Sequence, residues 1–244
     1  MKRSKRIGAQ IGPYDPFWVQ VQEAVQHKAQ QFGVELIPIE MAGNPDTFSS
    51  REQTNLLEEL LAQKLDALIC WNLPNELIRS ILKNDLPAIY LAESNIRHPL
   101  FVSPAGLYEA GKMVGHFLAE KLNGRGRILC VGGLSEQGGE NGQSRLSGFS
   151  DALQKFSGID WEHFPSYWRY DQAYPQIQQA LLQFGSPINA IFGLSDSLAL
   201  ASRDALQKSG ILDERVLIAG VNGDPQALAA IADGSFSATV ETSA

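Results

Sequence analysis

Short apolar segments alternate with longer segments of helical periodicity along almost the whole chain. In the first pair, Arg6–Gly12 alternates between apolar and polar positions, as a strand does, and Gly12 and Pro13 end the alternation. Apolar residues then recur at helical spacing and stop before Gly33: Trp18, Val21, Val25, Ala29 and Phe32. Because glycine is favoured just after a helix, the pattern predicts a strand, a tight turn and a helix.

The same alternation continues to the end of the chain. Further strands or extended segments are predicted at 34–40, 66–71, 87–91, 99–102, 127–131, 161–167, 190–193, 216–220 and 236–241. Helices are predicted between them at 50–64, 75–83, 105–122, 144–156, 174–184, 196–208 and 224–233. Strands that alternate with helices form parallel sheets with helices on both faces and right-handed connections, so we predict an α/β fold.

Two segments of the chain resemble each other, which indicates two similar halves. Asp66–Leu77 and Asn189–Leu198 both run from an apolar strand through a polar turn into a helix. We interpret the halves as two Rossmann-like lobes, each a parallel sheet with helices on both faces. The first lobe is expected to span residues 1–103 and the second 104–244. Since no low-complexity linker separates them, crossing strands are expected to join them.

The turn before the first helix carries a dense set of rings beside a carboxylate, namely Tyr14, Asp15, Phe17 and Trp18. In open parallel sheets the ligand crevice lies beyond the carboxyl ends of the strands, where this turn is expected. Such rings can lie against the apolar face of a small ring-shaped ligand while polar neighbours bind its edge. The alternative is that Phe17 and Trp18 only fasten the helix to its sheet, and the sequence leaves both interpretations open.

Composition and charge exclude several classes of protein. A hydrophobic content of 44% and a charged content of 19% are typical of a soluble globular protein. A net charge of −7 argues against a nucleic-acid-binding surface, which needs a clustered basic face. No apolar segment approaches the roughly 18 residues of a membrane span, so no membrane insertion is expected. The basic start, residues 1–6, is not followed by the apolar core of a signal peptide, so we expect a cytosolic chain or one without its export signal.

No catalytic or metal-binding motif is found along the chain. The segment 132–139 is rich in glycine but has neither dinucleotide-binding nor P-loop spacing, and the four histidines are scattered. Cys70 and Cys130 lie in predicted buried strands, so we expect two inert core thiols without a disulfide or a metal. Asp196 and Asp224 begin predicted helices, where capping alone would explain a carboxylate. We therefore expect binding rather than catalysis, with no cofactor.

Five motifs of this chain resemble the motifs of one family, and they occur in the same order. They are Asp-Pro-Phe-Trp at 15–18, Leu-Pro-Ala-Ile-Tyr-Leu-Ala-Glu at 86–93, Gln-Ser-Arg-Leu-Ser-Gly-Phe at 143–149, the strand–turn–helix segment 190–201, and Gly-Val-Asn-Gly-Asp-Pro at 220–225. In these motifs the chain resembles the type I periplasmic binding proteins for sugars, of the ribose-binding kind. Their fold is shared with the effector domains of lac-repressor-type regulators. The resemblance extends over essentially the whole chain.

The resemblance implies that two lobes close on a sugar. Carried over position by position, it implies ligand-binding roles for Asp15, Phe17, Trp18, Ala92, Glu93, Arg145, Ser195, Asn222 and Thr242. Ribose binders have Asp-Arg where this chain has Ala92 and Glu93. Ser195 stands for an asparagine of the family and Asn222 for an aspartate. Because most of the charged hydroxyl-binding groups are replaced while the rings remain, we expect a carbohydrate other than ribose.

The resemblance leaves three classes of function to separate. The first is the solute receptor of an ABC importer, with a membrane permease as partner and a periplasmic or cell-surface location. The second is a sensory domain of the same fold attached to a signalling output, which could be cytoplasmic. The third is an α/β enzyme, which the lack of a catalytic motif disfavours. Family members continue beyond the point that corresponds to Thr242, so we expect a fragment whose first lobe lacks its last helix and strand.

Overall fold

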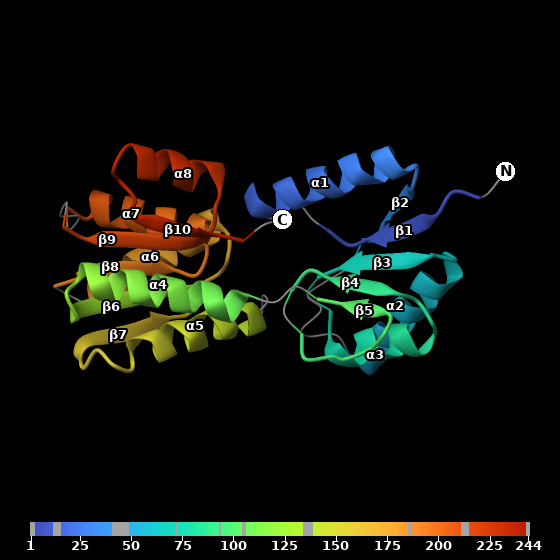
Figure 1. The fold of residues 1–244 in the computed structure, drawn as a ribbon, viewed down its shortest axis with the longest axis horizontal. Coiled ribbons are helices and arrows are strands. Elements are labelled where there is room, and N and C mark those ends of the chain that lie inside the picture. Colours follow the sequence, from blue (N-terminus) through green and yellow to red (C-terminus); the bar gives the residue numbers. More distant parts are fainter. Residues whose placement is uncertain are drawn as a thin grey trace. The chain divides into compact units, whose positions relative to one another are not determined.

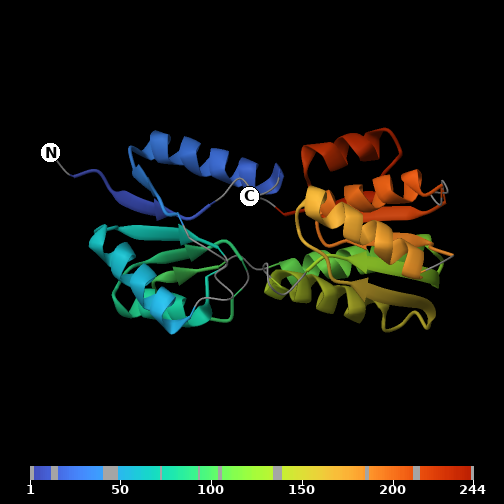
Figure 2. The same cartoon turned by 180° about the vertical axis from the view of Figure 1, so that it is seen from behind.

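The computed structural model describes residues 3–11, 16–40, 49–71, 73–92, 94–103, 106–133, 139–184, 187–210 and 215–242. The chain divides into two compact units, residues 1–105 and residues 106–243 (Figures 1 and 2). Each unit is an α/β structure with its own sheet and its own hydrophobic core.

The first unit contains a five-stranded parallel sheet in the order β2-β1-β3-β4-β5. Its elements in chain order are β1 (Arg6–Ala9), α1 (Pro16–Phe32), β2 (Glu35–Pro38), α2 (Ser50–Ala62), β3 (Ala67–Cys70), α3 (Asn75–Lys83), β4 (Ala88–Tyr90) and β5 (Phe101–Val102). Helix α2 begins at a capping box, in which Ser49 and Glu52 each accept a backbone N–H of the other.

The core of the first unit lies on the side of its sheet that α2 and α3 cover, whereas α1 runs along the other side (Figure 1). Leu68 and Cys70 of β3 belong to this core together with Leu60 and Ile78 from the two helices. On the α1 side, Val102 of β5 is 62% exposed and pairs in register with Ile89, which is also exposed. Among the described residues, helices therefore cover one face of this sheet more fully than the other.

The second unit contains a five-stranded parallel sheet in the order β10-β9-β8-β6-β7. Its elements are α4 (Leu107–Lys121), β6 (Arg125–Val131), α5 (Gly139–Leu153), β7 (Gly158–Phe164), α6 (Tyr170–Phe184), β8 (Ala190–Gly193), α7 (Asp196–Lys208), β9 (Leu217–Asn222), α8 (Pro225–Ala232) and β10 (Ala238–Glu241). All four residues of β8 are buried, as expected of a central parallel strand covered on both faces.

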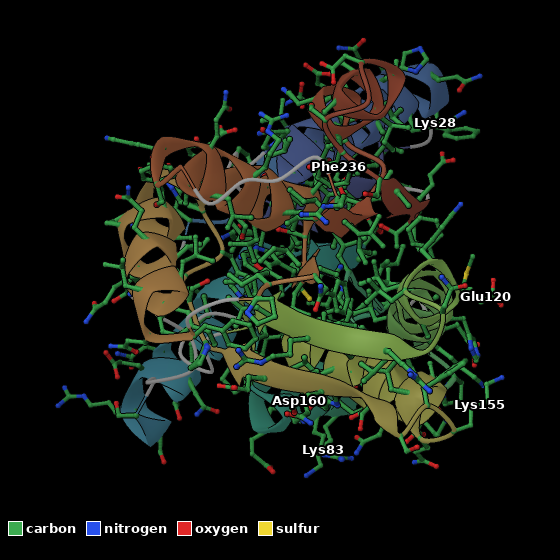
Figure 3. The ribbon with its side chains drawn as sticks, turned by 90° about the vertical axis from the view of Figure 1, so that its left-hand side faces the viewer. Lys28, Lys83, Glu120, Lys155, Asp160 and Phe236 are labelled. Carbon is green, nitrogen blue, oxygen red and sulfur yellow. The ribbon has the colours of Figure 1, made fainter. Side chains whose placement is uncertain are left out.

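Helices cover both faces of the second sheet, with α4 and α5 on one side and α6 and α7 on the other (Figure 1). Phe149 of α5 stacks on Phe192 of β8 with ring centroids 5.0 Å apart, so the core is continuous from helix to sheet. Figure 3 shows the charged ends of Glu120, Lys155 and Asp160 pointing outward, while Phe236 lies inside.

Helices α4 and α5 cross so closely that glycine is required on both. A Cβ atom added to Gly148 of α5 would lie 2.8 Å from the carbonyl carbon of Tyr108 and 3.0 Å from the amide nitrogen of Lys112. One added to Gly111 of α4 would lie 2.6 Å from the carbonyl carbon of Arg145. The two backbones are therefore in direct contact at the crossing.

The predicted α/β fold with parallel sheets is confirmed, while some element bounds were wrong. Helix α6 begins at Tyr170 rather than 174, because the ring of Tyr170 stacks on Tyr174 and its hydroxyl donates to Asp204 at 2.7 Å. Helix α5 spans 139–153 rather than 144–156, and its early glycines weaken the periodic pattern there. Cys70 and Cys130 are buried free thiols, and burial raises the pKa of both. None of the described helices is both long and apolar enough to span a membrane.

Candidate ligand-binding site

The nine predicted site residues divide between the two units. Asp15 and Glu93 lie outside the described residues. Phe17, Trp18 and Ala92 belong to the first unit, and Arg145, Ser195, Asn222 and Thr242 belong to the second. We describe each group within its own unit.

The four predicted residues of the second unit gather at the carboxyl ends of its strands. Arg145 projects from α5 and is only 7% exposed. Its Nη1 donates to the carbonyl oxygen of Leu194, just after β8, and its Nη2 donates to Oδ1 of Asn222 at 3.4 Å. The backbone N–H of Thr242 donates to the carbonyl of Asn222 at 3.3 Å. One arginine therefore links the ends of β8 and β9, beside the end of β10.

An arginine near the start of a helix can also pair with a nearby carboxylate at the surface, but the burial of Arg145 excludes that role. A guanidinium this deeply buried must be hydrogen-bonded, and the bonds from Nη1 to Leu194 and from Nη2 to Asn222 fix the orientation of the group. Glu140 is a carboxylate close in sequence that could form such a pair, and its side chain lies outside the described residues. We conclude that Arg145 is part of the strand-end cluster of the second unit.

Ser195 is the N-cap of α7, and its Oγ accepts the backbone N–H of Leu198 at 3.4 Å. This leaves Asp196 without the capping role expected for it, because its carboxylate accepts from Gly223, Asp224 and Thr239 instead. Burial raises the pKa of Asp196 above its ordinary value, and these hydrogen bonds and the nearby charge of Arg145 offset only part of that rise. Asp224 is the N-cap of α8, but its side chain makes no capping hydrogen bond there.

Trp168 lies beside the candidate site residue Arg145, and the sequence did not reveal it. It lies between β7 and α6, and its ring centroid is 5.7 Å from Cζ of Arg145. Its Nε1 is buried and, among the described residues, has no hydrogen-bond partner. The only available signal was an aromatic residue just after a predicted strand, at the same sheet edge as the other site residues. A flat ring and an N–H donor thus lie beside the arginine.

The glycine-rich segment after β6 serves close packing where the structure describes it. A Cβ atom on Gly142 of α5 would lie 2.7 Å from Cα of Gly133, and one on Gly133 would lie 3.0 Å from Cδ1 of Leu194. Gly133 has a φ of 73°, in the region that glycine adopts most readily. The glycines therefore let α5 approach the end of β8, which carries Leu194.

In the first unit, Trp18 packs between other rings. Its centroid is 4.6 Å from that of Trp71, at the end of β3, and 5.3 Å from that of Phe17. Trp18 is 9% exposed and Ala92 is also buried, whereas Phe17 is partly exposed. This burial favours a packing role for Trp18, and contact of these three residues with a ligand stays a prediction. Trp71 completes the ring cluster and was missed because it follows an apolar strand without a break.

Comparison with known proteins identifies the family. The model of the periplasmic binding protein domain matches residues 12–243. The chain belongs to the periplasmic binding protein family. The resemblance to its sugar-binding type I members is thereby confirmed.

Relatives from this family match almost the whole chain. The ribose import binding protein of Bacillus subtilis (strain 168) is 25% identical, over 98% of this chain and 76% of the relative. Among solved structures, the binding protein of the arabinose ABC transporter from Shewanella sp. ANA-3, bound to L-arabinofuranose, has a TM-score of 0.82 at 21% identity, covering 98% of this chain and 81% of that one. A solute-binding protein from Actinobacillus succinogenes 130z with bound D-allose has a TM-score of 0.79 at 22% identity, covering 98% and 85%. These structures share the fold of this periplasmic binding protein.

Proposed function

We propose that this chain is a non-enzymatic receptor for a small carbohydrate, which it presents to the membrane permease of an ABC importer. A periplasmic or cell-surface location follows from this role. The observation that supports it best is the buried Arg145, held between Leu194 and Asn222 and lying beside the ring of Trp168. Relatives named for ribose, D-allose and L-arabinofuranose support the class of ligand.

The chemistry of the cluster suits a neutral polyhydroxylated ring. The Arg145 fork and the indole N–H of Trp168 can donate to ring and hydroxyl oxygens, while the hydroxyl and amide groups of Ser195, Asn222 and Thr242 can both donate and accept. The face of Trp168 can lie against the C–H face of a sugar. Because the family's aspartate at the end of β9 is replaced by Asn222, we propose a monosaccharide other than D-ribose.

The proposed receptor binds with both units. In this proposal the boundary between the lobes falls near 103–104, the four residues of the second unit hold the hydroxyls, and the first unit contributes Asp15, Phe17, Trp18, Ala92 and Glu93. Burial of Trp18 and Ala92 makes Phe17 the described residue of the first unit best placed for contact.

A thermal-unfolding screen tests the proposal. The panel is D-ribose, D-allose, L-arabinose, D-galactose, D-fructose and myo-inositol, each at millimolar concentration, with amino acids and nucleosides as other ligand classes. A sugar at 100 times its Kd should stabilise the folded protein by about 2.7 kcal/mol and raise its Tm by several degrees. Stabilisation by a compound of another class, with no response to any sugar, would refute the proposal.

A further inference from the structure

The end of β9 leads into its turn through an unfavourable backbone conformation at a predicted ligand-binding residue. Asn222 has a φ of 140°, and Gly223 follows with a φ of 80°. A side-chain-bearing residue at such a φ costs on the order of 1–3 kcal/mol and persists only where its surroundings hold it. The same residue accepts the hydrogen bond from Arg145. Something must therefore hold this turn in place.

The side chain that holds the turn belongs to α7. Asp196, the first residue of α7, is completely buried, and its Oδ2 accepts the backbone N–H groups of Gly223 at 2.9 Å and Asp224 at 2.8 Å. Its Oδ1 accepts the hydroxyl of Thr239 in β10 at 2.7 Å. The carboxylate thus connects α7, β10 and the turn between β9 and α8.

Strand β9 has a glycine at the position that contacts this carboxylate. A Cβ atom on Gly220 of β9 would overlap Oδ1 of Asp196, so the position of the carboxylate depends on a glycine. The hydroxyl of Thr239 also accepts the N–H of Gly223, at 3.2 Å. The Asp196 carboxylate and the Thr239 hydroxyl bonded to it therefore both accept the N–H of Gly223, the residue that directly follows Asn222.

We propose that Asp196 is a positioning residue of the ligand site, which holds the turn so that Asn222 presents its side chain to Arg145. The inference rests on the proposed function in one respect, that Asn222 and Arg145 bind the ligand. The two adjacent residues at the start of α7 then have different roles. Ser195 caps the helix, and Asp196 holds the turn between β9 and α8. If Asp196 only stabilised the fold, its removal would lower stability but would leave the side chains of Asn222 and Arg145 in their positions.

The first experiment uses the unliganded protein, so it does not depend on a sugar. NMR signals of the Asn222 side-chain amide and the Arg145 guanidinium are compared between wild type, Asp196→Ala and Asp196→Asn, together with amide exchange at Gly223 and Asp224. Asp196→Ala should shift the Asn222 and Arg145 signals and speed amide exchange at least tenfold. Asp196→Asn should restore them, because its carbonyl can still accept both N–H groups. Leu206→Ala is the control, since Leu206 is buried on the same helix away from the turn.

Thr239→Val provides a second variant if Asp196→Ala does not fold, because it keeps the side-chain shape and removes only the hydroxyl. It should move the same signals in the same direction by a smaller amount. Unchanged Asn222 and Arg145 signals in Asp196→Ala, or in Thr239→Val if that variant alone folds, would overturn the proposal. Equal changes in Leu206→Ala would also overturn it, since they would reflect general loosening.

The second experiment measures affinity by calorimetry with the compound of the sugar panel (D-ribose, D-allose, L-arabinose, D-galactose, D-fructose or myo-inositol) that raises the Tm of the wild type most. Asp196→Ala should lose at least tenfold in affinity, and Asp196→Asn should stay within threefold. If no sugar of the panel binds the wild type, the proposed function fails, while the NMR comparison still decides the role of Asp196. Full affinity in a folded Asp196→Ala variant would overturn the positioning role.

Discussion

Replacing Gly148 by alanine should destabilise the second unit, because its Cβ would meet the backbone of α4. The added atom would lie 2.8 Å from the carbonyl carbon of Tyr108 and 3.0 Å from the amide nitrogen of Lys112. Both neighbours are backbone atoms inside a helix, so neither can rotate away as a flexible side chain could. The helices must separate, and α5 must move with them.

The size of the effect follows from two opposing contributions. Alanine favours a helix over glycine by about 1 kcal/mol, and overpacking a close contact costs about 1–3 kcal/mol. A backbone contact belongs at the upper end of that range, so we expect a net loss of about 2 kcal/mol in the free energy of unfolding. With a urea m-value of about 2 kcal/mol/M, the unfolding midpoint should fall by about 1 M.

The assay must report on the second unit alone. Trp18 and Trp71 lie in the first unit, so a background in which both are phenylalanine leaves Trp161 and Trp168 as fluorescent reporters of the second. Met113→Ala on α4 is the control, because Met113 is 57% exposed and should change stability by no more than about 0.5 kcal/mol. A Gly148→Ala variant as stable as the wild type would show that the close crossing is not required, and the reasoning would be refuted.

Three further predictions concern the site and the first unit. Arg145→Ala should weaken sugar binding by about 2–5 kcal/mol, and it should also lower stability by about 1–3 kcal/mol because its buried hydrogen-bond partners lose their donor. Calorimetry measures the first value and urea unfolding the second, and an affinity equal to that of the wild type would contradict the binding role. Trp168→Phe keeps a ring but removes the indole donor, so affinity should fall by about 1 kcal/mol, and an unchanged Kd in calorimetry would show that the N–H does not contact the ligand. Hydrogen bonds from Lys5 and the N–H of Arg6 lower the pKa of Asp66 below its ordinary 3.8. Asp66 should therefore stabilise the fold above that pH and lose this contribution as the pH falls, so the urea midpoints of wild type and Asp66→Asn should converge in acid; a constant difference would exclude the ionised group as the cause.

The sequence predicted those parts of the structure that depend on local pattern. Ser195 and Asn222 were named because their motifs resemble those of the family, and the structure places Ser195 just after β8 and Asn222 at the end of the neighbouring strand β9. Trp168 lies in an irregular segment, so its position beside Arg145 depends on how α5 and β7 pack rather than on any period. Asp196 was misread as a cap because helix starts favour carboxylates, whereas its partners lie 28 and 43 positions further along the chain.

The division of the chain into two consecutive stretches also bears on how the protein folds during synthesis. The five described strands of the first sheet all precede residue 106, so they can pair while the second unit is still being translated. At about 5–20 residues per second, synthesis of residues 106–243 gives the first unit roughly 7–30 s to fold before the last edge strand, β10, is made. In the second unit, the strand that pairs with the Asn222 end of β9 is therefore the last of the described strands to be made.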